Sequence, residues 1–98
     1  TSLLMPPSSL ITTPQLIELA KVARQYGGIY STHIRDEGQG VYRSVNEAIE
    51  IARGAKIRVD IIHLKIADQK LWGQMKEVIA MIDKARAEGL DVRANVYP

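Results

Sequence analysis

The sequence predicts an α/β fold, and within that class part of a (β/α)8 TIM-like barrel, about three β/α units with parallel strands. A helical pattern followed by a short β-branched run occurs three times along the 98 residues. Helices that alternate with strands in this way form parallel sheets with right-handed crossovers. A closed barrel needs about 250 residues, so this chain would hold roughly three eighths of one. An open doubly wound sheet is the alternative.

Three helices are expected, each with an apolar stripe at helical spacing. The first follows a loop at 1–12, and Thr12 or Thr13 can cap its first turn. A glycine closes each helix, because glycine readily adopts the left-handed conformation common at helix ends. The stripes are Leu16, Leu19, Ala20 and Ala23, then Val41, Val45, Ala48, Ile49 and Ala52, then Leu71, Met75, Val78, Ile82 and Ala85, and the closing glycines are Gly27 or Gly28, Gly54 and Gly89.

A strand is expected after each helix, at 28–33, 57–63 and 91–97, where apolar and β-branched residues are concentrated. The chain is therefore expected to be a single partial barrel segment over 1–98, with repeating α-β units over 13–98. It begins with threonine rather than methionine, which suggests a piece of a longer protein.

Composition excludes several classes of function. The net charge is +2, and the basic residues are scattered, so no basic stripe is available to neutralise nucleic-acid phosphates. No run of about 18 apolar residues predicts a membrane span. The chain has no cysteine, so it contains no disulfide and no thiolate metal ligand. A reducing compartment fits, and we expect a cytoplasmic protein.

The only two histidines, His33 and His63, lie thirty residues apart, each as the last residue of an expected strand. Parallel strands end at one edge of a sheet, about 4.8 Å apart, so both imidazoles could reach one zinc ion at about 2.0–2.1 Å. Strand alternation places His63 on the same face as Ile57, Val59 and Ile61. The alternative is a pair of structural histidines. Catalytic zinc usually has three protein ligands, so further ligands must come from elsewhere.

The strand ends also carry recognisable motifs. "GGIYSTHIRDEG", "IIHLK" and "NVYP" resemble consecutive strand-end motifs of the D-aminoacylases, the N-acyl-D-amino-acid deacylases of the metal-dependent amidohydrolase superfamily. The resemblance extends from about Thr13 onward and includes "YRSVNEAIEIARGAKI" and "KARAEGLDV". It implies a zinc-dependent barrel enzyme that hydrolyses the amide bond of N-acyl-D-amino acids, with His33 and His63 as metal ligands.

The resemblance also implies how the remaining parts of the site are supplied. The metal would polarise the scissile carbonyl and lower the pKa of a bound water. The general base would be an aspartate on the last barrel strand, so no catalytic residue is expected within this chain. Lys65 would contact the substrate carboxylate and Tyr97 would line the pocket. Lys65 follows His63 by two residues, so strand alternation could point it to the same side. A solvated lysine at the rim is the alternative.

Charged residues surround both histidines. Arg35, Asp36 and Glu37 could orient the metal ligands, or they could form an ion-pair network at the rim that holds the loop. Arg58 and Asp60 are expected on the outward face of their strand, which a helix would cover in an intact barrel. They could pair with each other, or they could lie at the exposed start of the strand.

The chain departs from the family pattern at several positions, and two of its aromatic residues have two interpretations. The family's His-x-His pair, bridging cysteine and last-strand aspartate are absent from the 98 residues. Asn95 stands where relatives often carry aspartate. Trp72 and Tyr42 could line an acyl pocket, although helix packing is the favoured interpretation.

Two other functions fit the sequence. One is a cyclic-amide hydrolase of the same superfamily, related to the dihydroorotases or hydantoinases. The other is a non-enzymatic α/β binding module with structural histidines. The expected partners are a small N-acyl amino acid and either the remainder of the barrel or a second copy of the chain, since missing strands would leave exposed apolar edges. The chain alone is expected to be inactive, with no nucleic-acid or membrane partner.

Overall fold

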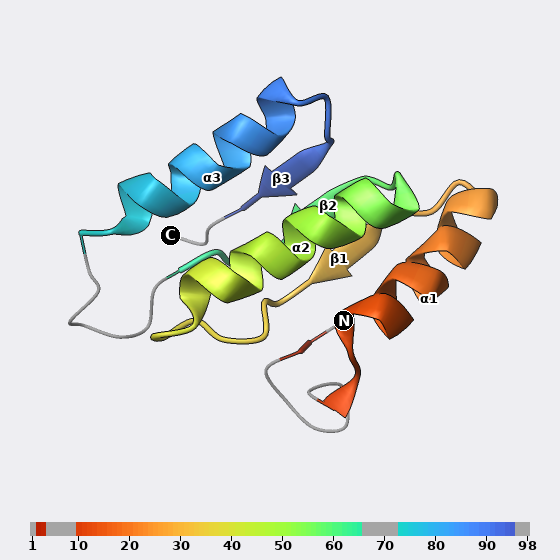
Figure 1. The fold of residues 1–98 in the computed structure, drawn as a ribbon, viewed down its shortest axis with the longest axis horizontal. Helices are drawn as coiled ribbons and strands as arrows, with labels where there is room; N and C mark the ends of the chain where they lie inside the picture. The colour runs from red at the N-terminus through yellow and green to blue at the C-terminus, as the bar shows by residue number, and fades with distance from the viewer. Residues whose placement is uncertain (1, 4–9, 66–72, 96–98) are drawn as a thin grey trace.

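The computed structural model describes residues 2–3, 10–65 and 73–95. The predicted alternation of helices and strands is confirmed (Figure 1). The elements are α1 (Thr13–Gln25), β1 (Tyr30–Thr32), α2 (Val41–Ala55), β2 (Val59–Ile61), α3 (Met75–Ala87) and β3 (Val92–Ala94). β1 and β2 have three residues each, fewer than predicted, and each begins two residues later than expected. The predicted end of the third strand, at 96–97, lies outside the described residues. No helix in the described ranges is long and apolar enough to cross a membrane.

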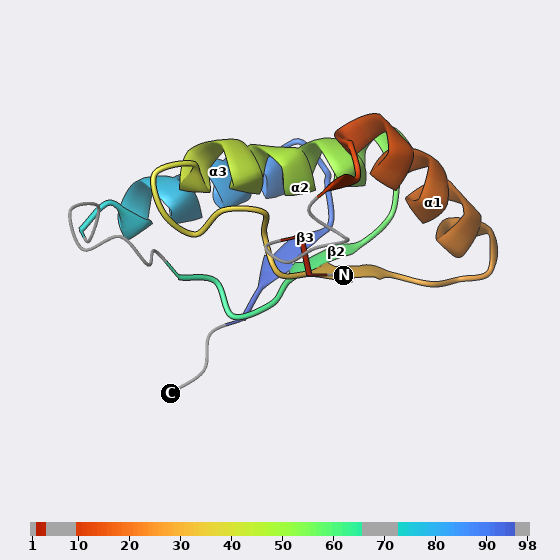
Figure 2. The same ribbon diagram turned by 90° about the horizontal axis from the view of Figure 1, so that it is seen from below.

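The three strands form one parallel sheet in the order β1-β2-β3. Its register pairs Thr32 with Ile61, and Ile61 with Ala94. Figure 2 shows all three helices on one side of this sheet. In a doubly wound sheet the strand order reverses and helices cover both faces. Sequential strands with helices on a single side therefore favour the barrel.

The sheet buries the side chains that face the helices. Val59 and Ile61 are fully buried, and they belong to one apolar core with residues of all three helices. Arg58 and Asp60 alternate with them and so face the other side. The prediction that Arg58 and Asp60 lie on the helix-covered face was wrong, because the single helical layer takes the apolar side of each strand.

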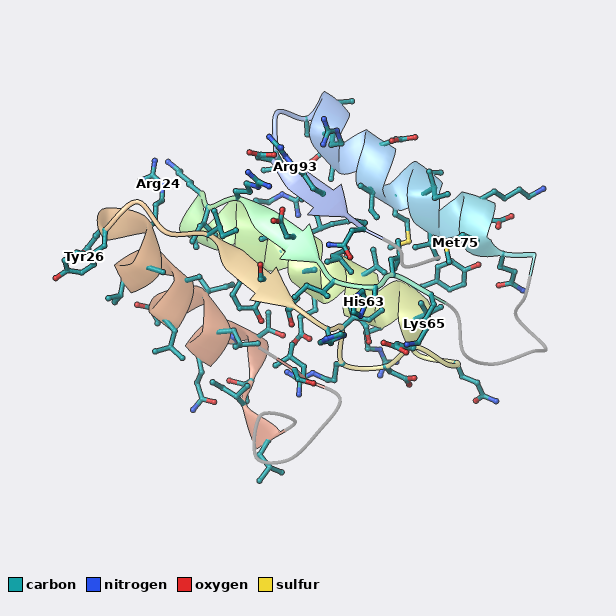
Figure 3. All side chains as sticks on the ribbon, turned by 180° about the vertical axis from the view of Figure 1, so that it is seen from behind. Arg24, Tyr26, His63, Lys65, Met75 and Arg93 are labelled. Atoms are coloured by element: carbon teal, nitrogen blue, oxygen red, sulfur yellow. The ribbon has the colours of Figure 1, made fainter. Side chains whose placement is uncertain are left out.

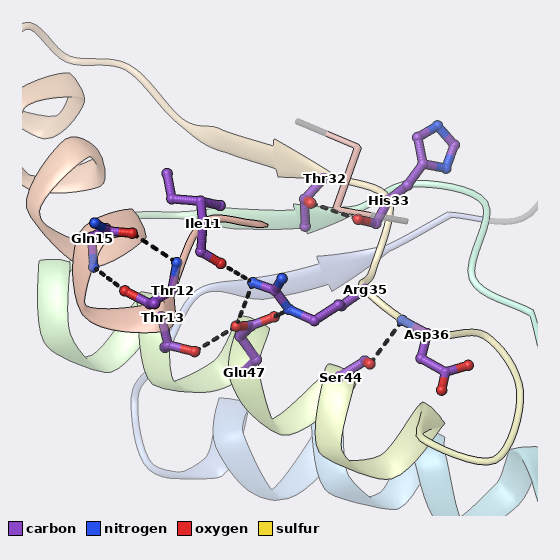
Figure 4. Close-up of polar contacts among 10 residues, drawn as sticks. All are labelled: Ile11, Thr12, Thr13, Gln15, Thr32, His33, Arg35, Asp36, Ser44 and Glu47. Carbon is purple, nitrogen blue, oxygen red and sulfur yellow. Dashed lines mark hydrogen bonds and ion pairs between the residues drawn. The ribbon is translucent and has the colours of Figure 1, made fainter. Parts of the chain in front are cut away.

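Helix α1 begins where the sequence predicts. Thr12 is the N-cap, and its hydroxyl accepts a hydrogen bond from the Gln15 backbone nitrogen at 3.4 Å. The Gln15 side chain accepts in return from the Thr12 nitrogen at 2.9 Å (Figure 4). This reciprocal pair is a capping box, which satisfies two backbone N–H groups that the first helical turn leaves unpaired.

The helix ends follow the prediction at two of three glycines. Gly27 and Gly89 have φ of +75° and +93°, and they follow α1 and α3. The prediction that Gly54 ends α2 was wrong: the helix continues, and Lys56 takes the left-handed conformation. A Cβ at Gly54 would lie 3.0 Å from the Ile17 side chain of α1. Gly54 therefore allows close packing of α1 on α2.

The core contains most of the predicted helical stripes. Leu16 and Ala20 of α1 are buried, as are the stripes of α2 and the described interior of α3. Leu19 was predicted to lie on the apolar face of α1 but is 60% exposed. Val22 of the same helix and its C-cap residue Tyr26 are also exposed. One side of α1 thus carries large apolar groups that no described residue covers.

Helix α2 has no side-chain cap of its own, and Asp36 replaces it. The Asp36 carboxylate accepts hydrogen bonds from the backbone nitrogens of Gly38 at 2.7 Å and Gly40 at 3.1 Å. The Asp36 nitrogen donates to the Ser44 hydroxyl at 2.9 Å. These contacts fold the β1–α2 loop back onto the start of α2, so the loop that follows His33 has a defined path.

Substituting Gly40→Ala tests this loop. The new Cβ would lie 2.5 Å from Asp36 Oδ2, closer than packed atoms allow. We expect the free energy of unfolding to fall by about 1–3 kcal/mol, measured by urea denaturation followed by circular dichroism. In an Asp36→Ala background the same substitution should cost much less, because the clashing carboxylate is gone. Additive effects of the two substitutions would contradict this account.

Candidate metal centre

The two histidines lie side by side at the carboxyl ends of neighbouring strands. Their ring centres are 5.3 Å apart and the ring planes are inclined by 63°. His33 directly follows β1, where it forms an isolated parallel bridge with Ser2, and His63 follows β2 by two residues. Both were predicted to be the last strand residue, which is wrong by one and two positions. The predicted proximity of the rings is nevertheless present.

The separation of the rings suits a shared tetrahedral ion. With one nitrogen about 2.0–2.1 Å from zinc, each imidazole centre lies about 3.2 Å from the ion, so two rings at the tetrahedral angle have centres about 5.2 Å apart. The observed 5.3 Å matches this arrangement. Among the residues that the structure describes, no group of three or more potential ligands gathers around one point. The described residues therefore offer two nitrogen ligands and no complete site.

A turn, not strand alternation, sets the direction of the second imidazole. His63 has φ of +53°, in the left-handed region, and it lies in the turn after β2. Regular alternation would put His63 on the helix side of the sheet, with buried Val59 and Ile61. His33 follows buried Thr32, so alternation puts it on the opposite side. An uninterrupted strand would thus aim the two rings at opposite faces. The predicted alternation through His63 was wrong, and the turn brings the rings together.

Asn95, just after β3, holds this turn from one side. Its side-chain Oδ1 accepts from the His63 nitrogen at 2.9 Å, and its carbonyl accepts from the Leu64 nitrogen at 2.8 Å. Its own nitrogen donates to the Ile61 carbonyl at 3.0 Å. On the other side, the Ile62 nitrogen donates to the Thr32 carbonyl at 2.8 Å. From the sequence Asn95 has no assigned role, because the third strand was predicted to run through it to residue 97, whereas β3 ends at Ala94.

Arg35 anchors the loop that follows His33. Its guanidinium donates to both carboxylate oxygens of Glu47 at 3.1 Å each and to the Ile11 carbonyl at 2.7 Å. Thr13 also donates to Glu47. Figure 4 shows the Arg35 and His33 side chains leaving the loop in opposite directions. These contacts join the loop to α2 and to the start of α1.

Glu37 and Lys65 connect the two loops that carry the histidines. Lys65 Nζ lies 3.4 Å from Glu37 Oε2, and the exposed fractions of the side chains are 44% and 8%. Figure 3 shows His63 and Lys65 together at the end toward which the strands point. A nearly buried carboxylate therefore keeps a half-exposed ammonium group beside the imidazole pair.

Three other residues were considered from the sequence as possible lining of a substrate pocket. Tyr42 packs against the core, and its hydroxyl donates to the Gln74 side chain at 2.6 Å, which joins the starts of α2 and α3. Tyr97 and Trp72 lie outside the described residues.

The sheet face opposite the described helices carries charged residues along β2 and β3. Arg58 donates to both oxygens of Asp60 at 3.0 and 3.1 Å, so the predicted pairing is confirmed. This hydrogen bond raises the pKa of Arg58. Arg93 donates to Asp91 at 2.9 Å and lowers the pKa of Asp91. Asp60 and Arg93 are register partners, so these charges form one polar cluster over the starts and middles of β2 and β3.

Comparison with known proteins identifies the relatives of this chain. No protein-family model matches. The chain is 36% identical over 93 residues to a D-aminoacylase of Alcaligenes xylosoxydans xylosoxydans, covering 95% of this chain and 19% of that protein. It is 34% identical over 98 residues to the N-acyl-D-glutamate deacylase of the same organism, covering 100% of this chain and 20% of the relative.

Solved structures give the same result. The crystal structure of N-acyl-D-glutamate deacylase from Bordetella bronchiseptica, complexed with zinc and a phosphonate inhibitor, matches with a TM-score of 0.93 at 32% identity. A D-aminoacylase crystal structure matches with a TM-score of 0.92 at 33% identity. Each match covers 99% of this chain and 21% of the other chain. These amidohydrolases have a TIM-barrel domain.

The chain spans about a fifth of the length of the curated relatives that it matches. Both the sequence and the backbone structure of this chain match these relatives over nearly its whole length. The chain is therefore a homologue of one segment of the D-aminoacylases and N-acyl-D-amino-acid deacylases.

Proposed function

We propose that this chain supplies one part of a zinc-dependent centre that hydrolyses the amide bond of N-acyl-D-amino acids. The observation that carries the proposal is the 5.3 Å separation of the His33 and His63 ring centres, which suits two ligands of one tetrahedral ion. The homologous deacylase structure with zinc supports the choice of metal. Bound zinc would act as a Lewis acid toward the substrate carbonyl.

The residues of this chain have distinct roles in the proposal. His33 and His63 each present one neutral imidazole nitrogen to the metal. Arg35 and Asp36 hold the loop after His33 and thereby support its position, through the contacts to Glu47 and to the start of α2. In the proposal, the other ligands and the general base come from other parts of the barrel. The described residues offer two ligands at this point.

Lys65 is proposed to bind the substrate carboxylate, with Glu37 holding it in place. The Lys65 side chain is 44% exposed, whereas that of Glu37 is nearly buried. A substrate carboxylate can therefore approach Lys65 from solvent while Glu37 remains its ion-pair partner within the protein. Tyr97 remains a predicted pocket residue.

The exposed side of α1 is proposed to contact further β/α units of the barrel, or a second copy when the chain is alone. Leu19, Val22 and Tyr26 are exposed there, and together with Leu10 they leave large apolar groups in water. Burying such groups is favourable by about 25 cal/mol per Å². In this proposal the 98 residues form one partial barrel domain rather than an independent module.

Zinc titration and a turnover assay on the 98-residue chain test the proposed centre. Isothermal titration should detect one bound zinc per chain. His33→Ala or His63→Ala should each weaken zinc binding by at least about tenfold, because even the loss of a residue that only hydrogen-bonds to a metal ligand lowers the affinity by that much. Asp83→Asn, on the exposed side of α3, is the control and should bind as the parent does. Unchanged affinity in both histidine variants would contradict the site.

The same zinc-loaded chain should release no amino acid from N-acetyl-D-amino acids, because in this proposal the remaining ligands and the base come from other parts of the barrel. Substantial zinc-dependent hydrolysis would contradict the proposal that the centre is incomplete.

Replacing Lys65→Met in an active full-length protein that contains this segment tests the substrate contact. Losing a hydrogen bond to a charged group should lower kcat/KM for N-acyl-D-amino acids by about tenfold to a hundredfold. The corresponding carboxamides should be much less affected, because they carry no charge at that position. Lys21→Met is the matched control, since its side chain is 48% exposed on α1 and pairs only locally with Glu18. Equal losses for acids and carboxamides would refute the contact.

Light scattering tests the proposed burial of the α1 surface. The isolated chain should show a mass that rises with concentration, and Leu19→Glu should reduce this association by placing a charge in the apolar surface. Glu18→Gln, one position away, should leave it unchanged. A clean monomer at high concentration would rule out self-association through this surface.

A further inference from the structure

We propose that Asn95 is a positioning residue of the metal centre, and that its side chain holds His63 in the left-handed turn that directs the imidazole toward His33. The inference rests on the proposed function only for the identity of the bound ion. The contact itself, between Asn95 Oδ1 and the His63 nitrogen at 2.9 Å, is independent of any metal.

The turn needs an external support. His63 has φ of +53°, a conformation that residues with a side chain rarely adopt unless their surroundings hold them there. The backbone nitrogens of His63 and Leu64 past the end of β2 need acceptors, and the carbonyl of Ile61 at the strand end needs a donor. Asn95 supplies all three: it accepts from the nitrogens of His63 and Leu64 and donates to the carbonyl of Ile61.

Only one of these three contacts depends on the type of residue at position 95. The contacts to Leu64 and Ile61 use the backbone of Asn95, so any residue except proline at that position can retain them. The contact to the His63 nitrogen uses the side-chain oxygen. A substitution that removes only this oxygen therefore tests the hold on His63 without removing the strand-end pairing.

The consequence for the imidazole follows from strand geometry. If the His63 nitrogen loses its acceptor, the residue can relax toward the extended conformation of the preceding strand. Alternation would then direct its side chain to the helix side, with Val59 and Ile61, and away from His33. The contact thus controls whether two nitrogen ligands can meet, and it acts through the backbone nitrogen of His63. An aspartate would supply the same acceptor, whereas leucine has a similar size and no acceptor.

The experiment compares Asn95→Leu with Asn95→Asp in the 98-residue chain, with Asn46→Leu on the exposed side of α2 as the matched control. Three quantities are measured: hydrogen exchange of the His63 amide, the nuclear Overhauser contact between the two imidazole rings without metal, and the zinc affinity. Asn95→Leu should lose the amide protection and the ring contact, and it should bind zinc at least about tenfold more weakly. Asn95→Asp and Asn46→Leu should retain both structural signals, and they should bind zinc within about threefold of the parent.

The outcomes separate this inference from the proposed function. If Asn95→Leu retains the protected amide and the ring contact, the positioning role is overturned whatever the zinc affinity. If the parent binds no zinc but the ring contact disappears in Asn95→Leu, the positioning role stands and the metal centre fails. Should Asn95→Leu not fold, Asn95→Ala removes the same acceptor without adding apolar bulk, and the same criteria apply to it.

Discussion

The candidate centre depends on one constraint: two neighbouring parallel strands must present imidazoles to the same point although their alternation directs them to opposite faces. His33 continues the alternation of β1, whereas His63 leaves it through a left-handed residue. The register, which pairs Thr32 with Ile61, then places the rings 5.3 Å apart. A shift of the register by one residue would exchange the faces of all following side chains. The two rings therefore meet only when the left-handed turn at His63 and the observed strand register are both present.

The loops around the centre are held by the helical layer. Arg35 joins the loop after β1 to Glu47 of α2, and Asp36 closes the same loop onto the start of α2. Glu37 then reaches across to Lys65 in the loop after β2. Three consecutive charged residues thus have three different partners, and each fixes a different part of the rim. Sites built on loops need such support to keep their geometry.

The two ends of the open sheet face differ in chemistry. The strand-start end carries the alternating charges of Arg58, Asp60, Asp91 and Arg93, which largely neutralise one another. The carboxyl end carries the histidines and Lys65. In β/α barrels function resides at the carboxyl ends of the strands, whereas the opposite end contributes to stability. The division observed here agrees with the family relationship.

Much of the fold was determined by the sequence itself. Helical stripes, the Thr12 cap, the glycines after α1 and α3, and the three-fold repeat are local patterns, so they predict element type and order without knowledge of distant contacts. The same patterns placed both histidines at adjacent strand ends. Local reasoning failed at Gly54, which packing against Ile17 rather than helix termination explains, and at Leu19, which the apolar stripe could not distinguish from a core residue.

Only the tertiary structure decided which side of each strand meets the helices, and how the second imidazole is aimed. The first depends on the placement of a single helical layer, which alternation along one strand cannot specify. The second depends on a hydrogen bond from His63 to Asn95, residues that are 32 positions apart in the sequence. Such a contact exists only once three strands have aligned in register, and no pattern within one strand contains that information.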